Sequence, residues 1–127
     1  MRKAVDFDGT LAEYHGFKGA DVLGDPIPVM VERVLGWMEN DDDVVICTAR
    51  AHPSNGDEAQ VAIDAIREWC VTHLGRELEV TCMKDPLMEE IYDDRAVTVE
   101  ENTGRILTEG FEEKLDDEPD SIGEFLS

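Results

Sequence analysis

Short apolar runs separated by a helix-period segment constrain the fold of this chain more than any other feature. Residues 44–47 form an unbroken apolar run, typical of a parallel strand covered on both faces, and residues 3–7 fit a second short buried strand. Between them, apolar side chains recur at helical spacing from residue 27 to about residue 39. A strand, a helix and a strand in this order favour an α/β fold. We therefore predict a three-layer Rossmann-like sandwich with a mostly parallel central sheet.

Local signals predict where the helices begin and end. Asp25 followed by Pro26 fits the start of the first helix, with the aspartate as its cap. Asn55 or Asp57 fits the cap of a second helix, which Gly75 would end. The remaining β-prone runs are residues 78–82, 91–92, 96–99 and 106–107.

The size and charge of the chain limit what it can do. Its 127 residues suffice for one hydrophobic core, so we predict one domain over residues 1–108, followed by an acidic surface helix or tail over residues 109–127. Acidic residues number 31 against 11 basic ones, which gives a formal net charge of -20. Because nucleic-acid binding rests on Lys and Arg neutralising phosphates, this balance argues against an extended nucleic-acid partner. A short nucleotide end remains compatible with it.

The cysteines and the apolar runs indicate the cellular setting. Cys47, Cys70 and Cys82 are odd in number and lack paired spacing, which favours a reducing, cytoplasmic compartment. The first residues lack the apolar core of a signal peptide, and no run approaches the ~20 apolar residues of a membrane span. We therefore expect an intracellular protein without a membrane partner.

Polar residues of a particular kind follow the predicted strands. In an open parallel sheet, ligands bind at the carboxyl ends of the strands, so these residues should converge. They are Asp6 and Asp8 after the first run, Thr48 and Arg50 after the second, Lys84 after the third, and Asp93 and Asp94 after the fourth.

Two carboxylates one residue apart at a strand end carry an electrostatic cost. Like charges so close raise each other's pKa unless a cation neutralises them, and a bound Mg²⁺ would do so. With the cation present, Asp6 could attack phosphorus while Asp8 moves the proton of the leaving group. The pair therefore indicates phosphoryl transfer.

The ordered set of motifs resembles the haloacid dehalogenase superfamily of phosphatases. The matching residues are Asp6-Phe7-Asp8-Gly9-Thr10, Thr48, Lys84 and Asp93-Asp94, and the match covers roughly residues 1–100. The resemblance implies that Asp6 is the nucleophile and that Asp8 is the general acid and base. It also implies that Thr48 and Lys84 bind the phosphoryl group.

The same resemblance implies a magnesium site. Asp6, the backbone carbonyl of Asp8, and Asp93 would bind Mg²⁺, and Asp94 would bind it through water. The spacing between the motifs leaves no room for a cap domain. The glycine-containing segment 13–24 is therefore predicted to be a mobile flap, and a homo-oligomer partner is a second way to cover the open site.

Two further motifs resemble the phosphatase half of polynucleotide kinase/phosphatase proteins. Thr48-Ala49-Arg50 and Asp93-Asp94-Arg95 match it, and this likeness implies that Arg50 holds a nucleotide 3'-phosphate. A structural salt bridge is the alternative role for Arg50. The chain contains no P-loop of the kind that the kinase half carries. Only eight residues separate Lys84 from Asp93, which predicts a compressed connection with one turn around residues 86–89.

The sequence therefore predicts a capless, Mg²⁺-dependent phosphomonoester hydrolase that acts on a small phosphorylated substrate through an aspartyl-phosphate on Asp6. One alternative is a nucleotide or polynucleotide 3'-phosphatase. An alternative of a different class is an inactive binding or regulatory module that keeps the fold and the metal.

Overall fold

The computed structural model describes residues 1–107. The chain divides after Asp94 into two compact units, which are described separately. The first unit, Met1–Asp94, contains all the named helices and strands. The predicted acidic tail at residues 109–127 lies outside the described residues.

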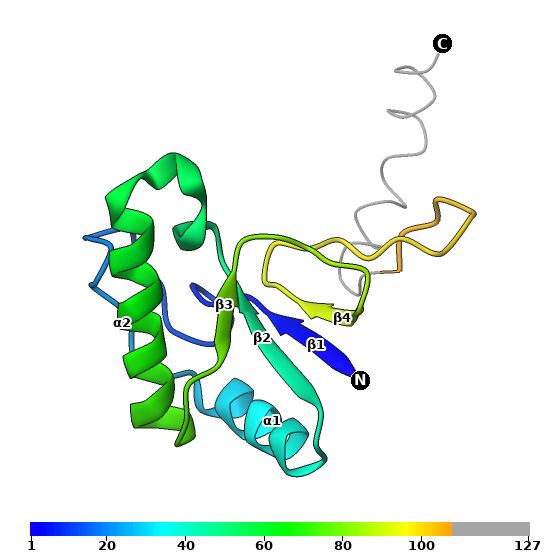
Figure 1. Cartoon of the computed structure of the whole chain (residues 1–127). Helices are drawn as coiled ribbons and strands as arrows, with labels where there is room; N and C mark the ends of the chain where they lie inside the picture. The colour runs from blue at the N-terminus through cyan, green and yellow to red at the C-terminus, as the bar shows by residue number, and fades with distance from the viewer. Residues whose placement is uncertain (108–127) are drawn as a thin grey trace. The chain divides into compact units, whose positions relative to one another are not determined.

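The first unit is built on a parallel four-stranded sheet (Figure 1). The strands are β1 (Arg2–Val5), β2 (Asp43–Cys47), β3 (Glu79–Thr81) and β4 (Met88–Tyr92), and the helices are α1 (Pro28–Glu39) and α2 (Asp57–Leu74). The strand order is β3-β2-β1-β4, and every neighbouring pair is parallel. This confirms the predicted α/β class and the Rossmann-like parallel sheet, and no cap domain is evident among residues 1–107.

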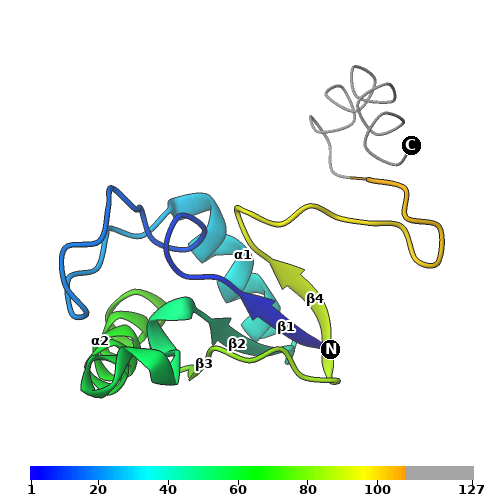
Figure 2. The ribbon, with the colours of Figure 1, turned by 90° about the horizontal axis from the view of Figure 1, so that it is seen from above.

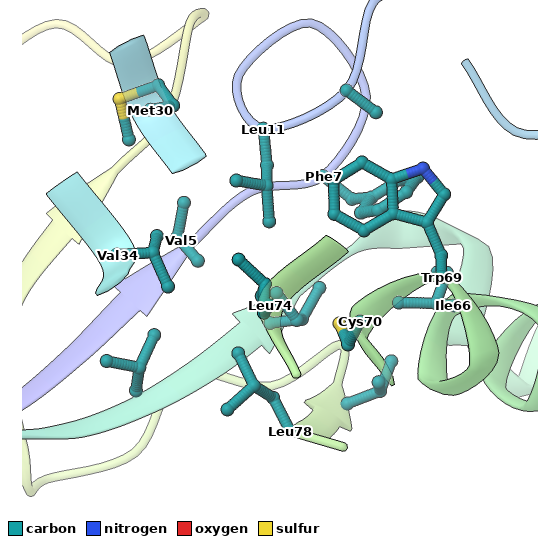
Figure 3. Packing of buried hydrophobic residues seen from close by; sticks show 14 residues of the cluster. Val5, Phe7, Leu11, Met30, Val34, Ile66, Trp69, Cys70, Leu74 and Leu78 are labelled. Atoms are coloured by element: carbon teal, nitrogen blue, oxygen red, sulfur yellow. The ribbon is translucent and has the colours of Figure 1, made fainter. Parts of the chain in front are cut away.

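Both helices cover the same face of the sheet. Side chains alternate between the two faces along a strand, and Val5, Ile46 and Val80 join one hydrophobic cluster with residues of α1 and α2. Phe7 is a fully buried member of that cluster and lies edge-on to Trp69 of α2, with 4.9 Å between ring centroids (Figure 3). The core therefore fixes the chain directly beside the exit of β1.

The opposite face is crossed by the connection between β3 and β4. Residues 82–87 pass from one edge of the sheet to the other, on the side away from α1 (Figure 2). Asp85 of this segment accepts a hydrogen bond from Arg2 Nε at 3.1 Å, and Arg2 points away from the helices. The compressed connection was predicted, but the turn lies at Pro86 and Leu87, because Met88 and Glu89 already belong to β4.

The predicted helix caps are wrong for both helices. α1 begins at Pro28 with Ile27 as its N-cap, and no side chain caps it. A residue before proline favours extended backbone, which keeps Ile27 out of the helix and prevents a start at Asp25. α2 begins at Asp57 after Gly56, again without a side-chain cap. Gly75 ends α2 as predicted, in the left-handed conformation that glycine accommodates most easily.

The second unit begins at Arg95. Its described part contains a tight turn, in which Val99 and Ile106 form an antiparallel bridge and Arg105 forms an ion pair with Glu100 at 2.8 Å. No helix in residues 1–107 has both the length and the apolar composition needed to cross a membrane.

Candidate active site

Three carboxylates meet at the carboxyl ends of the two neighbouring strands β1 and β4. Asp6 follows β1, and its backbone N–H donates to the carbonyl of Tyr92, the last residue of β4, at 2.8 Å. This pairing brings Asp93 and Asp94 beside Asp6. One carboxylate oxygen from each of the three residues lies within 4.8 Å of the other two. From β1 the chain continues to β2 and then β3 on one side, whereas β4 lies on the other side of β1. The cluster therefore lies at a switch point of the sheet, where the direction of the connections reverses.

The charge on this cluster is unfavourable in the absence of a cation. Burial, a hydrogen bond with Asp94 and the charge of Asp93 together raise the pKa of Asp6 from 3.8 to about 7. Three oxygen-bearing side chains at this spacing form a donor set that suits a hard divalent cation such as Mg²⁺. The arrangement therefore fits a cation site.

Thr10 and Gly9 position Asp94 within the cluster. The Thr10 hydroxyl donates to Asp94 Oδ1 at 3.0 Å and accepts from the Asp94 backbone N–H at 2.9 Å. Gly9 has a φ of +83°, and a Cβ at this position would lie 2.7 Å from Asp94 Oδ2. The Gly-Thr pair thus holds one carboxylate across the boundary between β1 and β4.

Asp8 points to a different partner. Its two carboxylate oxygens accept hydrogen bonds from Arg50 Nε at 2.7 Å and Arg50 Nη2 at 3.0 Å, a bidentate pair. Arg50 belongs to the short 3₁₀ turn Ala49–Ala51 after β2, and it is 8% exposed. The structure therefore separates the two acids of the first motif, with Asp6 in the carboxylate cluster and Asp8 on Arg50.

Thr48 and Lys84 lie in contrasting environments. Thr48 follows β2, is buried, and accepts a hydrogen bond from the Arg50 backbone N–H at 3.2 Å, so it caps the turn that carries Arg50. Its hydroxyl hydrogen can still be donated. Lys84 is exposed on the segment 82–87, and it makes no ion pair with Asp6 or with any other acid among residues 1–107.

The segment 13–24, predicted to be a mobile flap, is tied to the domain at several points. Glu13 donates its backbone N–H to the Asp25 carbonyl at 2.8 Å, and Trp69 Nε1 donates to the Gly24 carbonyl at 3.0 Å. Gly24 lies so close to the Glu13 backbone that a Cβ there would overlap the Glu13 carbonyl.

Sequence reasoning assigned no role to Thr10, and it predicted a mobile flap over residues 13–24 without these attachments. The threonine of the first motif was the available signal for Thr10. The attachment of the segment involves backbone carbonyls, which carry no sequence signal.

Comparisons with known proteins support the fold. No protein-family model matches the chain, and no curated protein matches it. A solved structure of a conserved protein from Bacteroides thetaiotaomicron is similar to it, with a TM-score of 0.52 and 25% sequence identity, over 93% of this chain and 90% of that one. That protein is described only as conserved, so the activity must be inferred from the site itself.

Proposed function

We propose that this chain is a divalent-cation-dependent phosphomonoester hydrolase of the haloacid dehalogenase type, with Asp6 as its nucleophile. The observation that carries the proposal is the convergence of Asp6, Asp93 and Asp94 within 4.8 Å at the switch point of a parallel sheet. An acid cluster of this kind is electrostatically unfavourable by itself, as the raised pKa of Asp6 indicates. A bound divalent cation would compensate the negative charge of the cluster.

Asp6, Asp93 and Asp94 would hold the cation. Oxygen donors of this type are those that Mg²⁺ prefers. When bound, Mg²⁺ would keep Asp6 ionised and offset the negative charge of the phosphoryl oxygens.

The residues of the chain account for both halves of the reaction. An Asp6 oxygen forms a bond to phosphorus while the ester P–O bond breaks, and Asp8 gives its proton to the departing oxygen. Water then attacks the phosphorus of the aspartyl-phosphate and gives its proton to Asp8, and the bond to Asp6 breaks to release phosphate. Thr48 would donate to a phosphoryl oxygen. Lys84, which is exposed and unpaired with Asp6, would contribute its positive charge to the phosphate.

The contacts of Arg50 bear on the alternative substrate. A clamp for a nucleotide 3'-phosphate needs donors that face the substrate, whereas Arg50 uses both edges of its guanidinium on Asp8 and on backbone carbonyls. The net charge of -20 also opposes a polynucleotide. We therefore propose a small phosphomonoester as the substrate.

The test is the release of phosphate from p-nitrophenyl phosphate with and without Mg²⁺. Activity should depend on the cation and should be lost in Asp6→Asn, with Asp64→Asn on the exposed face of α2 as the matched control. An Asp6→Asn protein that retains full activity would refute the assigned nucleophile. Stabilisation by Mg²⁺ without turnover of any phosphomonoester would favour the binding module instead.

A further inference from the structure

The Arg50 guanidinium joins Asp8 to the segment that follows the first motif. Nε and Nη2 donate to the Asp8 carboxylate. Nη1 donates to the carbonyls of Gly19 at 2.9 Å and Ala20 at 3.2 Å, and Nη2 also donates to the carbonyl of Val22 at 3.3 Å. A guanidinium has five N–H donors, so these contacts use all of them.

Further contacts hold Arg50 in this position. The Phe17 ring lies over the guanidinium, with Cζ 5.1 Å from the ring centroid. The Arg50 backbone carbonyl accepts a hydrogen bond from Asn55 Nδ2 at 3.2 Å, and its backbone N–H is bonded to Thr48. Because the residue is buried and its donors are all used, binding a phosphate would require it to break existing bonds.

We propose that Arg50 is a positioning residue that orients the Asp8 carboxylate and holds residues 17–22 in place, and that it does not bind the phosphate of the substrate. The inference rests on the proposed function for the role of Asp8 as proton donor. It follows from the fork geometry of arginine, which pairs both carboxylate oxygens with one edge and leaves the other edge for the carbonyls. The orientation of Asp8 and the position of residues 17–22 are then set by the same side chain.

The leaving group of the substrate distinguishes the two roles of Arg50. Glycerol phosphate needs a proton on its leaving oxygen, whereas p-nitrophenolate departs without one. If Arg50 acts through Asp8, Arg50→Ala should lower kcat for glycerol phosphate by about 100-fold and kcat for p-nitrophenyl phosphate by less than about tenfold. KM should change little for either ester, because no phosphate contact is removed.

Two further variants sharpen this comparison. Arg50→Lys keeps the charge but loses the fork, so it should behave like Arg50→Ala. If Arg50 bound phosphate, lysine would restore part of the activity, because an ammonium group also binds phosphate as a point charge. Asp8→Asn should show the same leaving-group pattern, and combining it with Arg50→Ala should lower the rate no further, because both changes remove one function.

Whether Arg50 holds residues 17–22 in place can be measured by proteolysis, independently of activity. Trypsin cleavage after the exposed Lys18 should be at least about tenfold faster in Arg50→Ala and Arg50→Lys than in the wild type. Arg76→Ala, which removes an exposed arginine just before β3, should cleave at the wild-type rate.

The outcomes separate this inference from the proposed function. The inference would be overturned if Arg50→Ala lowered kcat equally for both esters and raised KM, and if Arg50→Lys restored activity. It would also be overturned if cleavage after Lys18 were unchanged in both Arg50 variants. If the wild type released phosphate from neither ester, the proposed function would fail. The rate of trypsin cleavage would still decide whether Arg50 holds residues 17–22 in place.

Discussion

Replacing Asp6 by asparagine should stabilise the cation-free protein while abolishing its activity. Asp6 shares its site with Asp93 and Asp94, and its pKa is raised from 3.8 to about 7 by burial, by a hydrogen bond with Asp94 and by the charge of Asp93. An amide carries no charge, and its NH₂ group can donate to Asp94, so asparagine removes the repulsion and keeps a hydrogen bond.

The magnitude follows from the raised pKa. An acid whose pKa rises from 3.8 to about 7 on folding destabilises the ionised folded state by about 4 kcal/mol. The side chain is only partly buried, and solvent screens part of the repulsion, so we expect about half of this value. A gain of about 2 kcal/mol corresponds to a rise in Tm of about 6 °C for a domain of this size.

The gain should depend on pH in a definite direction. Between about pH 4 and pH 7 the folded wild type binds more protons at Asp6 than the unfolded chain does, so its stability falls as the pH rises. The destabilisation by ionised Asp6 is complete above about pH 7. It disappears below about pH 4, where Asp6 is protonated in both the folded and the unfolded state. The advantage of Asp6→Asn should follow the same curve.

Urea unfolding in EDTA at several pH values measures this difference. Asp64→Asn on α2 controls for the loss of one negative charge from an acidic protein. Adding Mg²⁺ should stabilise the wild type and leave Asp6→Asn nearly unchanged, because the variant lacks one of the three carboxylates. Equal or lower stability of Asp6→Asn near pH 8, with the control unchanged, would refute the assigned electrostatics.

Three other substitutions test the supports of the site. Gly9→Ala should weaken both Mg²⁺ binding, measured by the Tm shift, and phosphate release, because its Cβ would lie 2.7 Å from Asp94 Oδ2. The left-handed backbone adds about 1–2 kcal/mol of strain, measured by urea unfolding. Gly24→Ala should lower the free energy of unfolding by about 2 kcal/mol or more, because its Cβ would overlap a backbone carbonyl; the same unfolding assay checks it. Trp69→Phe keeps an aromatic ring but loses the bond to the Gly24 carbonyl, and should cost about 1 kcal/mol without changing kcat.

The elements of the first unit could be predicted because their signals are local. The apolar run at 44–47 became β2, the helical period from residue 27 became α1, and Gly75 ended α2. The caps could not be predicted as easily. Asp25 before Pro26 is a good local start signal, but Pro28 keeps Ile27 extended and delays the helix.

Part of the candidate site was also foreseeable. Parallel strands place their carboxyl ends at one edge, so acids that follow β1 and β4 meet there once those strands are neighbours. The role of Lys84 was inferred from the order of the motifs alone; this side chain is exposed on the segment 82–87 and makes no ion pair with an acid among residues 1–107.

The sequence by itself determined which helices and strands form and which functional groups follow them. Both are set by the hydrophobic periodicity and the residue types of a few neighbouring positions. Only the tertiary structure decided which charges meet. Asp6 and Asp8 are two residues apart, yet one joins the acids after β4 and the other joins Arg50 after β2. The order of the strands in space sets these pairings, and contacts between distant segments form only when the sheet assembles around its core.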